Sequence, residues 1–162
     1  EQFREACRII RENNLTRITI HQPVINMLQR VNEHGLLPVT AEEGTGVITF
    51  CPLAQGMLTD KYINGLPEDS RMGRRGEEGR KWYEEQKEKG TWEKVRKLNE
   101  VAKSRGQTLP QMALAWLLRD ERVTSVLIGV SRVKQLHENL ATLKRMKFEA
   151  DELELIESIL NT

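Results

Sequence analysis

The sequence predicts an α/β fold in which parallel strands alternate with helices. Three short runs rich in β-branched residues have the length of strands, at residues 17–20, 47–50 and 125–128. A proline or a glycine follows each run, and segments with the apolar spacing of amphipathic helices separate the runs. Because strands separated by helices are joined by crossover connections, we expect these strands to pair in parallel.

Apolar periodicity predicts the helices around these strands. The first helix precedes the first strand, and a weakly helical stretch precedes the second. Two helices lie between the second and third strands, and one of them opens at Pro110, whose missing N–H suits a first helical position. The apolar positions that define the helices are Phe3, Ala6, Cys7 and Ile10; Trp92, Val95, Leu98 and Ala102; Leu114, Leu117 and Leu118; Val133, Leu136, Leu140 and Leu143; and Leu153, Ile156 and Leu160.

A charged segment interrupts this pattern. Residues 71–97 contain ten basic and six acidic residues, with few apolar positions before Trp82. Such composition is typical of solvated surface chain. We predict a mobile loop over about residues 68–90 within a single domain of residues 1–162, with the later part of the segment turning helical.

Composition excludes several classes of function. The 162 residues include 25 Lys or Arg and 24 Asp or Glu, so the formal net charge is +1. This balance gives no reason to expect nucleic acid or a membrane surface as a partner. The longest apolar run, residues 112–118, has seven residues, whereas a bilayer span needs about 20.

The cysteine content favours a reducing cytoplasm. Cys7 and Cys51 are too few for a disulfide framework, and no Cys/His cluster predicts a metal site. No signal segment follows Glu1, so nothing indicates export, and we expect that residues were removed or that a longer chain precedes this piece.

The first two strand ends carry residues suited to a flat, phosphorylated ligand. His21 and Gln22 follow the first strand, and the Gln22 carboxamide can pair with another carboxamide. At the second strand end, Phe50 could stack on a heterocycle, while the turn after it exposes backbone N–H groups near Lys61 that could hold phosphate. The alternatives are a polar strand end for Gln22 and a core position with an ordinary turn for Phe50.

The third strand end predicts an anion site. Gly129 and Arg132 flank the join between strand and helix, where free N–H groups and the helix dipole favour negative charge. A polar stripe follows along the helix at Ser131, Gln135, Glu138 and Asn139. The stripe could contact the sugar and base of a nucleotide, or it could be a solvated helix face.

Several motifs together resemble one known family. They are His21-Gln22-Pro23 and residues 50–61 (FCPLAQGMLTDK), 65–72 (GLPEDSRM), 111–118 (QMALAWLL) and 123–139 (VTSVLIGVSRVKQLHEN). In this order and spacing they resemble the C-terminal half of an aldo-keto reductase, closest to the branch of the L-glyceraldehyde 3-phosphate reductases, which is related to the potassium-channel β-subunits. The resemblance covers essentially all 162 residues.

The resemblance implies an incomplete (β/α) TIM-type barrel, containing its sixth to eighth strands, and a site for NADPH. Gln22 would bind the nicotinamide carboxamide and Phe50 would stack on the nicotinamide ring. The residues implied to line the pyrophosphate are Pro52, Leu53, Gly56 and Lys61, with Arg71 near the adenosine side. Those implied to hold the 2′-phosphate and adenine, favouring NADPH over NADH, are Gly129, Ser131, Arg132, Gln135, Glu138 and Asn139.

Two positions depart from this branch. Ile25 stands where tyrosine is usual, which predicts altered packing near the nicotinamide. Asp60 stands where glycine commonly precedes the lysine, and its negative charge should weaken anion binding at Lys61.

The family's catalytic Asp, Tyr, Lys and His belong to the N-terminal half of the barrel, so we assign no catalytic residue and no metal. His21 lies at a strand end, but the resemblance makes it a neighbour of Gln22 rather than an acid. Three hypotheses remain: part of an NADPH-dependent reductase of aldehydes or ketones, an NADPH-binding remnant without turnover, and a structural or interaction module. Unpaired strand edges further predict a homo-oligomer.

Overall fold

Residues 1–161 are described by a computed structural model, and their strands form an open parallel sheet. The strands are β1 (Ile20–His21), β2 (Gly46–Thr49) and β3 (Ser125–Val126), in the order β1-β2-β3. Both pairs are parallel, with Ile20 opposite Gly46 and Ile48 opposite Ser125. The predicted α/β class and parallel pairing are therefore confirmed. Strand β1 covers only the end of its predicted run and one further residue, β2 has the predicted length but begins one residue earlier, and β3 begins as predicted but is two residues shorter.

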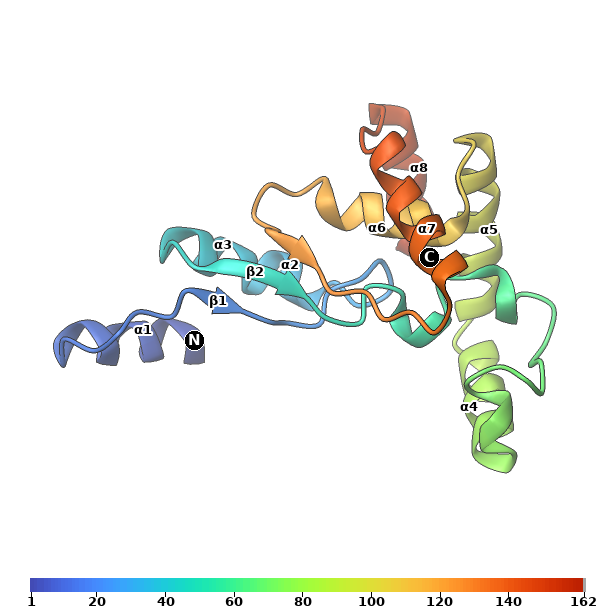
Figure 1. Ribbon diagram of the computed structural model, residues 1–162, viewed down its shortest axis with the longest axis horizontal. Coiled ribbons are helices and arrows are strands. Elements are labelled where there is room, and N and C mark those ends of the chain that lie inside the picture. The colour runs from blue at the N-terminus through green and yellow to red at the C-terminus, as the bar shows by residue number, and fades with distance from the viewer. Residues whose placement is uncertain (162) are drawn as a thin grey trace.

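The helices lie along one side of the sheet, and some of them extend past its ends (Figure 1). The α-helices are α1 (Gln2–Glu12), α2 (Val31–Gly35), α3 (Leu37–Glu42), α4 (Glu77–Glu88), α5 (Thr91–Ser104), α6 (Leu109–Leu118), α7 (Val133–Leu140) and α8 (Ala150–Leu160). The 3₁₀ turns are η1 (Ala54–Gly56), η2 (Asp60–Tyr62), η3 (Gly73–Arg75) and η4 (Ala141–Lys144). None of the described helices combines the length and apolar character that a membrane span requires.

Helix α6 is the centre of the core. Thr108 caps its N-terminus by accepting a hydrogen bond from the Gln111 N–H, and Pro110 is the second helical residue, one position later than predicted. Nearly all of α6 is buried, including Leu109 and Met112 to Leu117, and the helix packs against α5, η4 and β3. On β2, Val47 and Thr49 face these helices and are fully buried. This side of the sheet is therefore covered.

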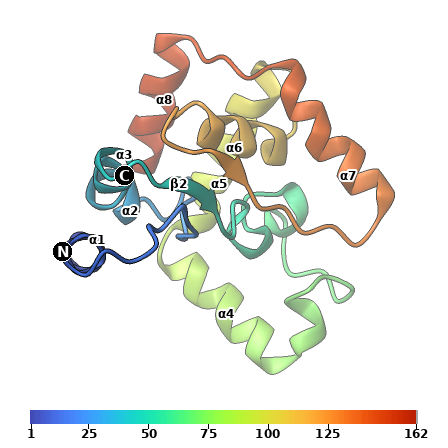
Figure 2. The same cartoon turned by 60° about the vertical axis from the view of Figure 1, so that its left-hand side comes forward.

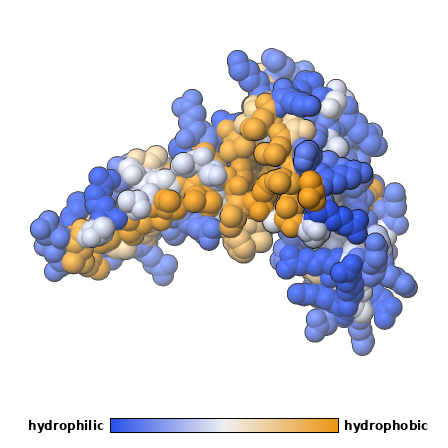
Figure 3. Space-filling model, in the orientation of Figure 1, coloured by the Kyte–Doolittle hydropathy of each residue, from blue (hydrophilic) through white to orange (hydrophobic). Residues whose placement is uncertain are grey.

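The opposite side of the sheet is open. Side chains alternate along a strand, so Ile48 and Phe50 point away from the helices that bury Val47 and Thr49. Phe50 is 44% exposed, and Ile20 and Leu127 on the neighbouring strands are 55% and 49% exposed. Figure 3 shows a hydrophobic band that runs from the left-hand arm to the centre of the visible face.

Helix α7 is also uncovered on its apolar side, and Figure 2 shows it standing at the outside of the fold. None of its residues is buried. Of the predicted apolar positions, Val133, Leu136 and Leu140 lie on α7 and are exposed by 72%, 37% and 53%, while Leu143 lies in η4 and is 65% exposed. Amphipathic periodicity thus identified the helix, but its apolar stripe has no covering element within residues 1–161.

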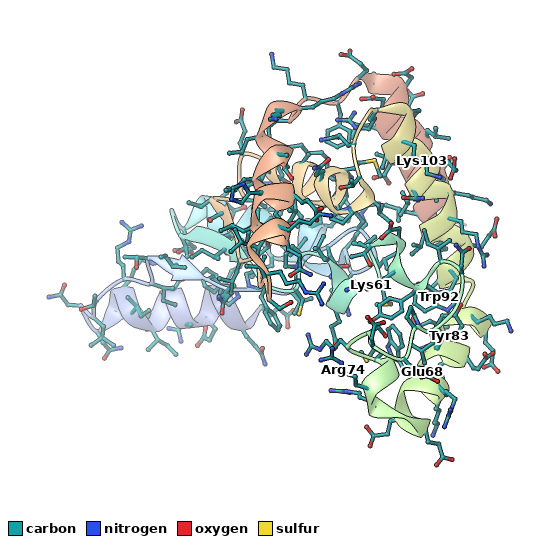
Figure 4. All side chains as sticks on the ribbon, turned by 45° about the vertical axis from the view of Figure 1, so that its right-hand side comes forward. Lys61, Glu68, Arg74, Tyr83, Trp92 and Lys103 are labelled. Carbon is teal, nitrogen blue, oxygen red and sulfur yellow. The ribbon has the colours of Figure 1, made fainter. Side chains whose placement is uncertain are left out.

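The segment predicted as a loop over about residues 68–90 contains helix α4, so the loop prediction is wrong for Glu77–Glu88. Close packing explains the helix. Gly79 lies so near the Met72 carbonyl oxygen that a Cβ there would be 1.9 Å from it. Tyr83 stacks on Trp92 of α5 with ring centroids 4.9 Å apart, as Figure 4 shows, and Trp82 meets the same ring edge-on at 5.6 Å. These aromatic contacts supply the burial that the charged composition concealed.

A buried carboxylate joins the segment after β1 to the core helices. Glu33 accepts hydrogen bonds at 2.7 Å from both Arg30 and Arg119. Arg30 also pairs with Glu157 of α8 at 2.8 Å, and the Arg119 guanidinium lies 3.8 Å from the ring centroid of Trp116. Burial by itself raises the pKa of Glu33, but the hydrogen bonds from the two arginines outweigh it, so the pKa lies below its ordinary value.

Replacing Glu33 with glutamine should lower the free energy of unfolding by about 2 kcal/mol at pH 7, because the partly buried Arg119 loses its carboxylate partner and Arg30 loses one of its two. A carboxylate with a lowered folded pKa stabilises the fold above its unfolded pKa of about 4.3 and loses this effect as pH falls through the folded value. Urea unfolding at several pH values should therefore show the difference between wild type and Glu33→Gln shrinking in acid. The control Glu93→Gln removes an exposed pair with Arg96 and should change stability by less than about 0.5 kcal/mol. Equal stability of wild type and Glu33→Gln at pH 7 would contradict this account.

Candidate functional site

The ends of β1 and β2 bring Gln22 and Phe50 to the same face of the sheet. Val24 forms a parallel bridge with Phe50, and the Phe50 N–H donates to the Pro23 carbonyl at 2.9 Å. Gln22 is two residues before Val24 and therefore shares its face. Both Gln22 and Phe50 are exposed on the open side of the sheet. The structure thus places a carboxamide and an aromatic ring at the carboxyl end of neighbouring parallel strands.

The third strand contributes to the same end. The Leu127 N–H donates to the Thr49 carbonyl at 2.9 Å, so the ladder between β2 and β3 continues past Val126. Gly129 follows two residues later and is exposed, with nothing within 4 Å of the position that a Cβ would take. An open strand end of this kind leaves the backbone accessible to a ligand.

The loop after β2 holds the next group of predicted residues. Pro52 is buried and Leu53 is partly buried, so they support the loop. The N–H groups of Ala54 and Gly56 donate to the carbonyls of Cys51 and Leu53, at 3.0 and 2.8 Å. The prediction that this turn exposes backbone N–H groups is therefore wrong for these two, because the loop uses them in its own turns.

Lys61 extends into solvent from a turn that is firmly held. Its N–H donates to the Thr59 hydroxyl at 3.3 Å, and the next residue, Tyr62, is 1% exposed. The Tyr62 ring lies 5.5 Å from Trp82 and 5.9 Å from Trp92. The Lys61 ammonium makes no ion pair with the described residues, and Figure 4 labels its place in the fold. A free cation on a rigid turn is suited to a phosphate group.

The N-terminus of α7 is occupied by one of its own side chains. The Gln135 carboxamide oxygen accepts from the Ser131 N–H at 2.9 Å, from the Ser131 hydroxyl at 3.1 Å and from the Arg132 N–H at 3.2 Å. The Arg132 side chain is exposed and forms no ion pair within residues 1–161. Gln135 therefore caps two of the amides that the sequence assigned to an anion, those of Ser131 and Arg132, while the Arg132 guanidinium makes no ion pair with the described residues.

The remaining predicted residues are not drawn into one pocket. Glu138 lies 3.8 Å from Lys134, and its carbonyl accepts from Gln111 of α6 at 3.0 Å, while Asn139 is partly buried. Arg71 is exposed before η3 and makes no hydrogen bond or ion pair with the described residues. A cavity of about 370 Å³ beside α4 contains none of the predicted cofactor residues, being lined by Leu66, Glu68, Gly73, Gly76, Arg80, Tyr83 and Glu84.

The two departures from the family pattern lie in different environments. Ile25 is 1% exposed and belongs to the hydrophobic core, on the side of the sheet away from Phe50. It therefore does not line the open face where Gln22 lies. Asp60 is exposed next to Lys61, as its sequence position implied.

Neither tyrosine offers a free hydroxyl at the strand ends. Tyr62 is buried in the aromatic cluster, and the Tyr83 hydroxyl lies 3.3 Å from the Tyr62 carbonyl, to which it donates. The His21 ring packs on Phe3 of α1 with centroids 5.0 Å apart. Among the described residues, no group of three His, Cys, Asp or Glu side chains is arranged to hold a metal ion.

Sequence reasoning assigned no role to Asn26, which the structure places between the first two strand ends. It is fully buried and bonds to the loops on both sides. An asparagine inside the apolar run of residues 24–28 (VINML) was the available signal, because a buried carboxamide requires several hydrogen-bond partners.

Comparisons with known proteins give this arrangement a family. The family model described as "Aldo/keto reductase family" matches residues 1–161. A curated L-glyceraldehyde 3-phosphate reductase of Escherichia coli O157:H7 is 50% identical over 141 residues, which cover 86% of this chain and 41% of that protein. A protein with the same name from Escherichia coli K12 is 46% identical over 158 residues, covering 97% of this chain and 45% of its own length.

The chain thus spans less than half the length of these curated relatives. The family model, in contrast, matches nearly the whole chain, and both identities far exceed what the fold alone would require. The motifs that suggested the resemblance and the parallel strand ends that carry them agree with this match. The chain therefore belongs to the aldo/keto reductase family.

Proposed function

We propose that this chain is the cofactor-binding part of an NADPH-dependent reductase of aldehydes or ketones. The observation that carries the proposal is the position of Gln22 beside Phe50 on the open face at the strand ends. A carboxamide next to an exposed aromatic ring is suited to a nicotinamide, which has a carboxamide on a flat ring. Both curated relatives are named as reductases of a phosphorylated aldehyde, and we extend the aldehyde class to this chain.

The three strands would be the sixth to eighth strands of a (β/α) barrel. Their parallel order, the helices on one side and the open apolar side all support this proposal. In a closed barrel the open side would face the barrel interior, where side chains of all strands pack together. Ligands of such barrels lie at the carboxyl ends of strands, which is where Gln22, Phe50 and Gly129 lie.

The residues present fit a dinucleotide in three places. Gln22 would orient the nicotinamide and Phe50 would stack on it, while Lys61 would neutralise the pyrophosphate beside Pro52, Leu53 and Gly56. Arg132 would pair with the 2′-phosphate through its planar guanidinium. The other residues proposed for the adenosine end are Arg71, Gly129, Ser131, Gln135, Glu138 and Asn139.

The Gln135 cap gives this proposal a specific requirement. A phosphate can use the amides of Ser131 and Arg132 only if the Gln135 oxygen leaves them. The exchange is favourable in principle, because a doubly charged phosphate is a stronger acceptor than a neutral carboxamide. Gln135 would then be free to contact the adenine.

Bound NADPH supplies the hydride of the reaction. The residues of this chain would bind and orient the cofactor, and we propose that the proton donor belongs to the part of the family barrel that lies outside this chain. The free thiols Cys7 and Cys51 are consistent with the proposed cytoplasmic location.

Arg132→Ala tests the assignment of the 2′-phosphate. Because one charge-assisted contact is lost, the Kd for NADPH should rise about tenfold or more, while binding of NADH, which has no 2′-phosphate, should change by less than about twofold. Titration followed by nicotinamide fluorescence measures both constants. Lys134→Ala is the matched control, since it removes an exposed α7 cation that pairs only distantly with Glu138 at 3.8 Å. Equal loss of NADPH and NADH affinity would contradict the assignment, and an absence of saturable binding by wild type would contradict the proposed function.

A second candidate function is a structural or interaction module that self-associates. The open sheet face favours it, since Ile20, Phe50 and Leu127 together with the α7 stripe form a large exposed apolar surface. The unpaired outer edges of β1 and β3 add backbone groups that a second chain could pair with. We therefore propose a homo-oligomer for this chain alone.

Leu127→Glu tests self-association. A carboxylate at the centre of the apolar face should shift the oligomer toward monomer, because burying an unpaired charge is costly. Light scattering at several protein concentrations measures the shift. Leu15→Glu is the matched control, because Leu15 is 56% exposed but lies in the connection after α1 rather than on the face. A wild-type chain that is monomeric at high concentration would contradict this proposal.

A further inference from the structure

We propose that Asn26 is a positioning residue that holds the Phe50 strand end against the Gln22 strand end, so that both reach the nicotinamide together. The inference rests on the proposed function, because it concerns how the same site is assembled. Asn26 itself would not touch the cofactor. It is fully buried, whereas Gln22 and Phe50 are exposed on the open face.

The Asn26 carboxamide uses its hydrogen-bonding capacity between the two loops. Its amide nitrogen donates to the Cys51 carbonyl at 3.0 Å and to the Gln29 side-chain oxygen at 3.2 Å. Its oxygen accepts from the Leu28 N–H at 3.0 Å. Since its backbone N–H also donates to the Gln29 carbonyl at 3.2 Å, the residue is fixed within its own loop and reaches the other.

The backbone at Cys51 requires such support. Its φ is +55°, a left-handed value that costs about 1–2 kcal/mol for a residue with a side chain. Cys51 also precedes Pro52, and a residue before proline prefers extended backbone. A conformation that is locally unfavourable persists only where surrounding contacts enforce it. The bond from Asn26 to the Cys51 carbonyl is one of these contacts, and the bond from the Ala54 N–H at 3.0 Å is another.

Fixing Cys51 also fixes Phe50. The left-handed turn directs the chain away from the sheet immediately after Phe50, which leaves the ring on the open face. The bridge between Val24 and Phe50 extends the parallel strand pairing as far as Phe50. The hydrogen bond from Asn26 to Cys51 joins the same two segments one residue after Phe50. Asn26 therefore determines where the strand ends and the ring is presented.

Asn32 provides a matched comparison within the same region. Asn32 is partly buried, and its carboxamide donates to the Val24 carbonyl at 2.9 Å but does not reach the loop after β2. Loss of Asn32 would loosen the first loop without releasing Cys51. Loss of Asn26 would release the contact between the two loops.

The experiment compares Asn26→Ala, Asn32→Ala and wild type with two probes. NADPH contains the nicotinamide, whereas adenosine 2′,5′-bisphosphate has only the adenosine end. Asn26→Ala should weaken NADPH binding about tenfold, as expected for the loss of the buried hydrogen bond that joins the two loops, and should change binding of the bisphosphate by less than about twofold. Asn32→Ala should leave the ratio of the two constants unchanged. A general loss of structure would lower both affinities together, so the ratio separates positioning from scaffolding.

A second measurement follows the Cys51 loop without any ligand. Cys51 is partly exposed and Cys7 is buried, so alkylation mapped by mass spectrometry reports each thiol separately. Asn26→Ala should raise the labelling rate of Cys51 at least about threefold relative to Cys7, and Asn32→Ala should not.

The outcomes separate this inference from the proposed function. Equal weakening of both probes by Asn26→Ala, an unchanged affinity for NADPH, or an unchanged labelling rate at Cys51 would each overturn the positioning role. Wild type that binds neither probe would instead contradict the proposed function and, with it, the inference that rests on it.

Discussion

A parallel sheet needs apolar cover on both faces, and in this chain only one face has it. Val47 and Thr49 of β2 are fully buried against the helices, whereas Phe50 and its neighbours on the other face are exposed. The core formed by α5, α6 and α8 holds the strands in parallel order, and this order brings the three strand ends to one edge. Packing on the covered face therefore positions the candidate site, whereas the open face is the surface available to a partner.

The site residues differ in how firmly the fold holds them. Gln22 and Phe50 are set by strand pairing, and Lys61 projects from a turn anchored by Tyr62 in an aromatic cluster. Arg132 precedes a helix with no buried residue, and Gln135 of that helix caps the amides of Ser131 and Arg132. If the proposed cofactor site is correct, NADPH would meet preformed Gln22 and Phe50 at its nicotinamide end, whereas Gln135 would have to move at its adenosine end. Moving the Gln135 side chain would cost free energy, and this cost would reduce the net contribution of the 2′-phosphate contacts to binding.

Polar groups in the covered part of the fold act as connections between segments. Glu33 links Arg30, in the segment after β1, to Arg119, which directly follows α6. Asn26 links the two loops at the ends of β1 and β2. Both are buried and fully bonded, so each specifies one arrangement of the segments that it connects. Apolar packing alone would tolerate several such arrangements. This explains why a few polar residues matter for the geometry of a site that they do not line.

The sequence by itself determined the class of fold, the parallel pairing, the helices around α6 and the family, because these follow from local periodicity and from motifs such as residues 123–139. Local pattern failed where long-range packing decides. Helix α4 forms because Trp82 and Tyr83 meet Trp92, and the apolar stripe of α7 is exposed because no described element covers it. The role of Asn26 was likewise hidden, since its partner Cys51 is distant in sequence. The tertiary structure alone decided which strand ends meet, which amides are already used within the protein, and which cations remain free, because hydrogen bonds between remote segments are not encoded in the periodicity of either segment.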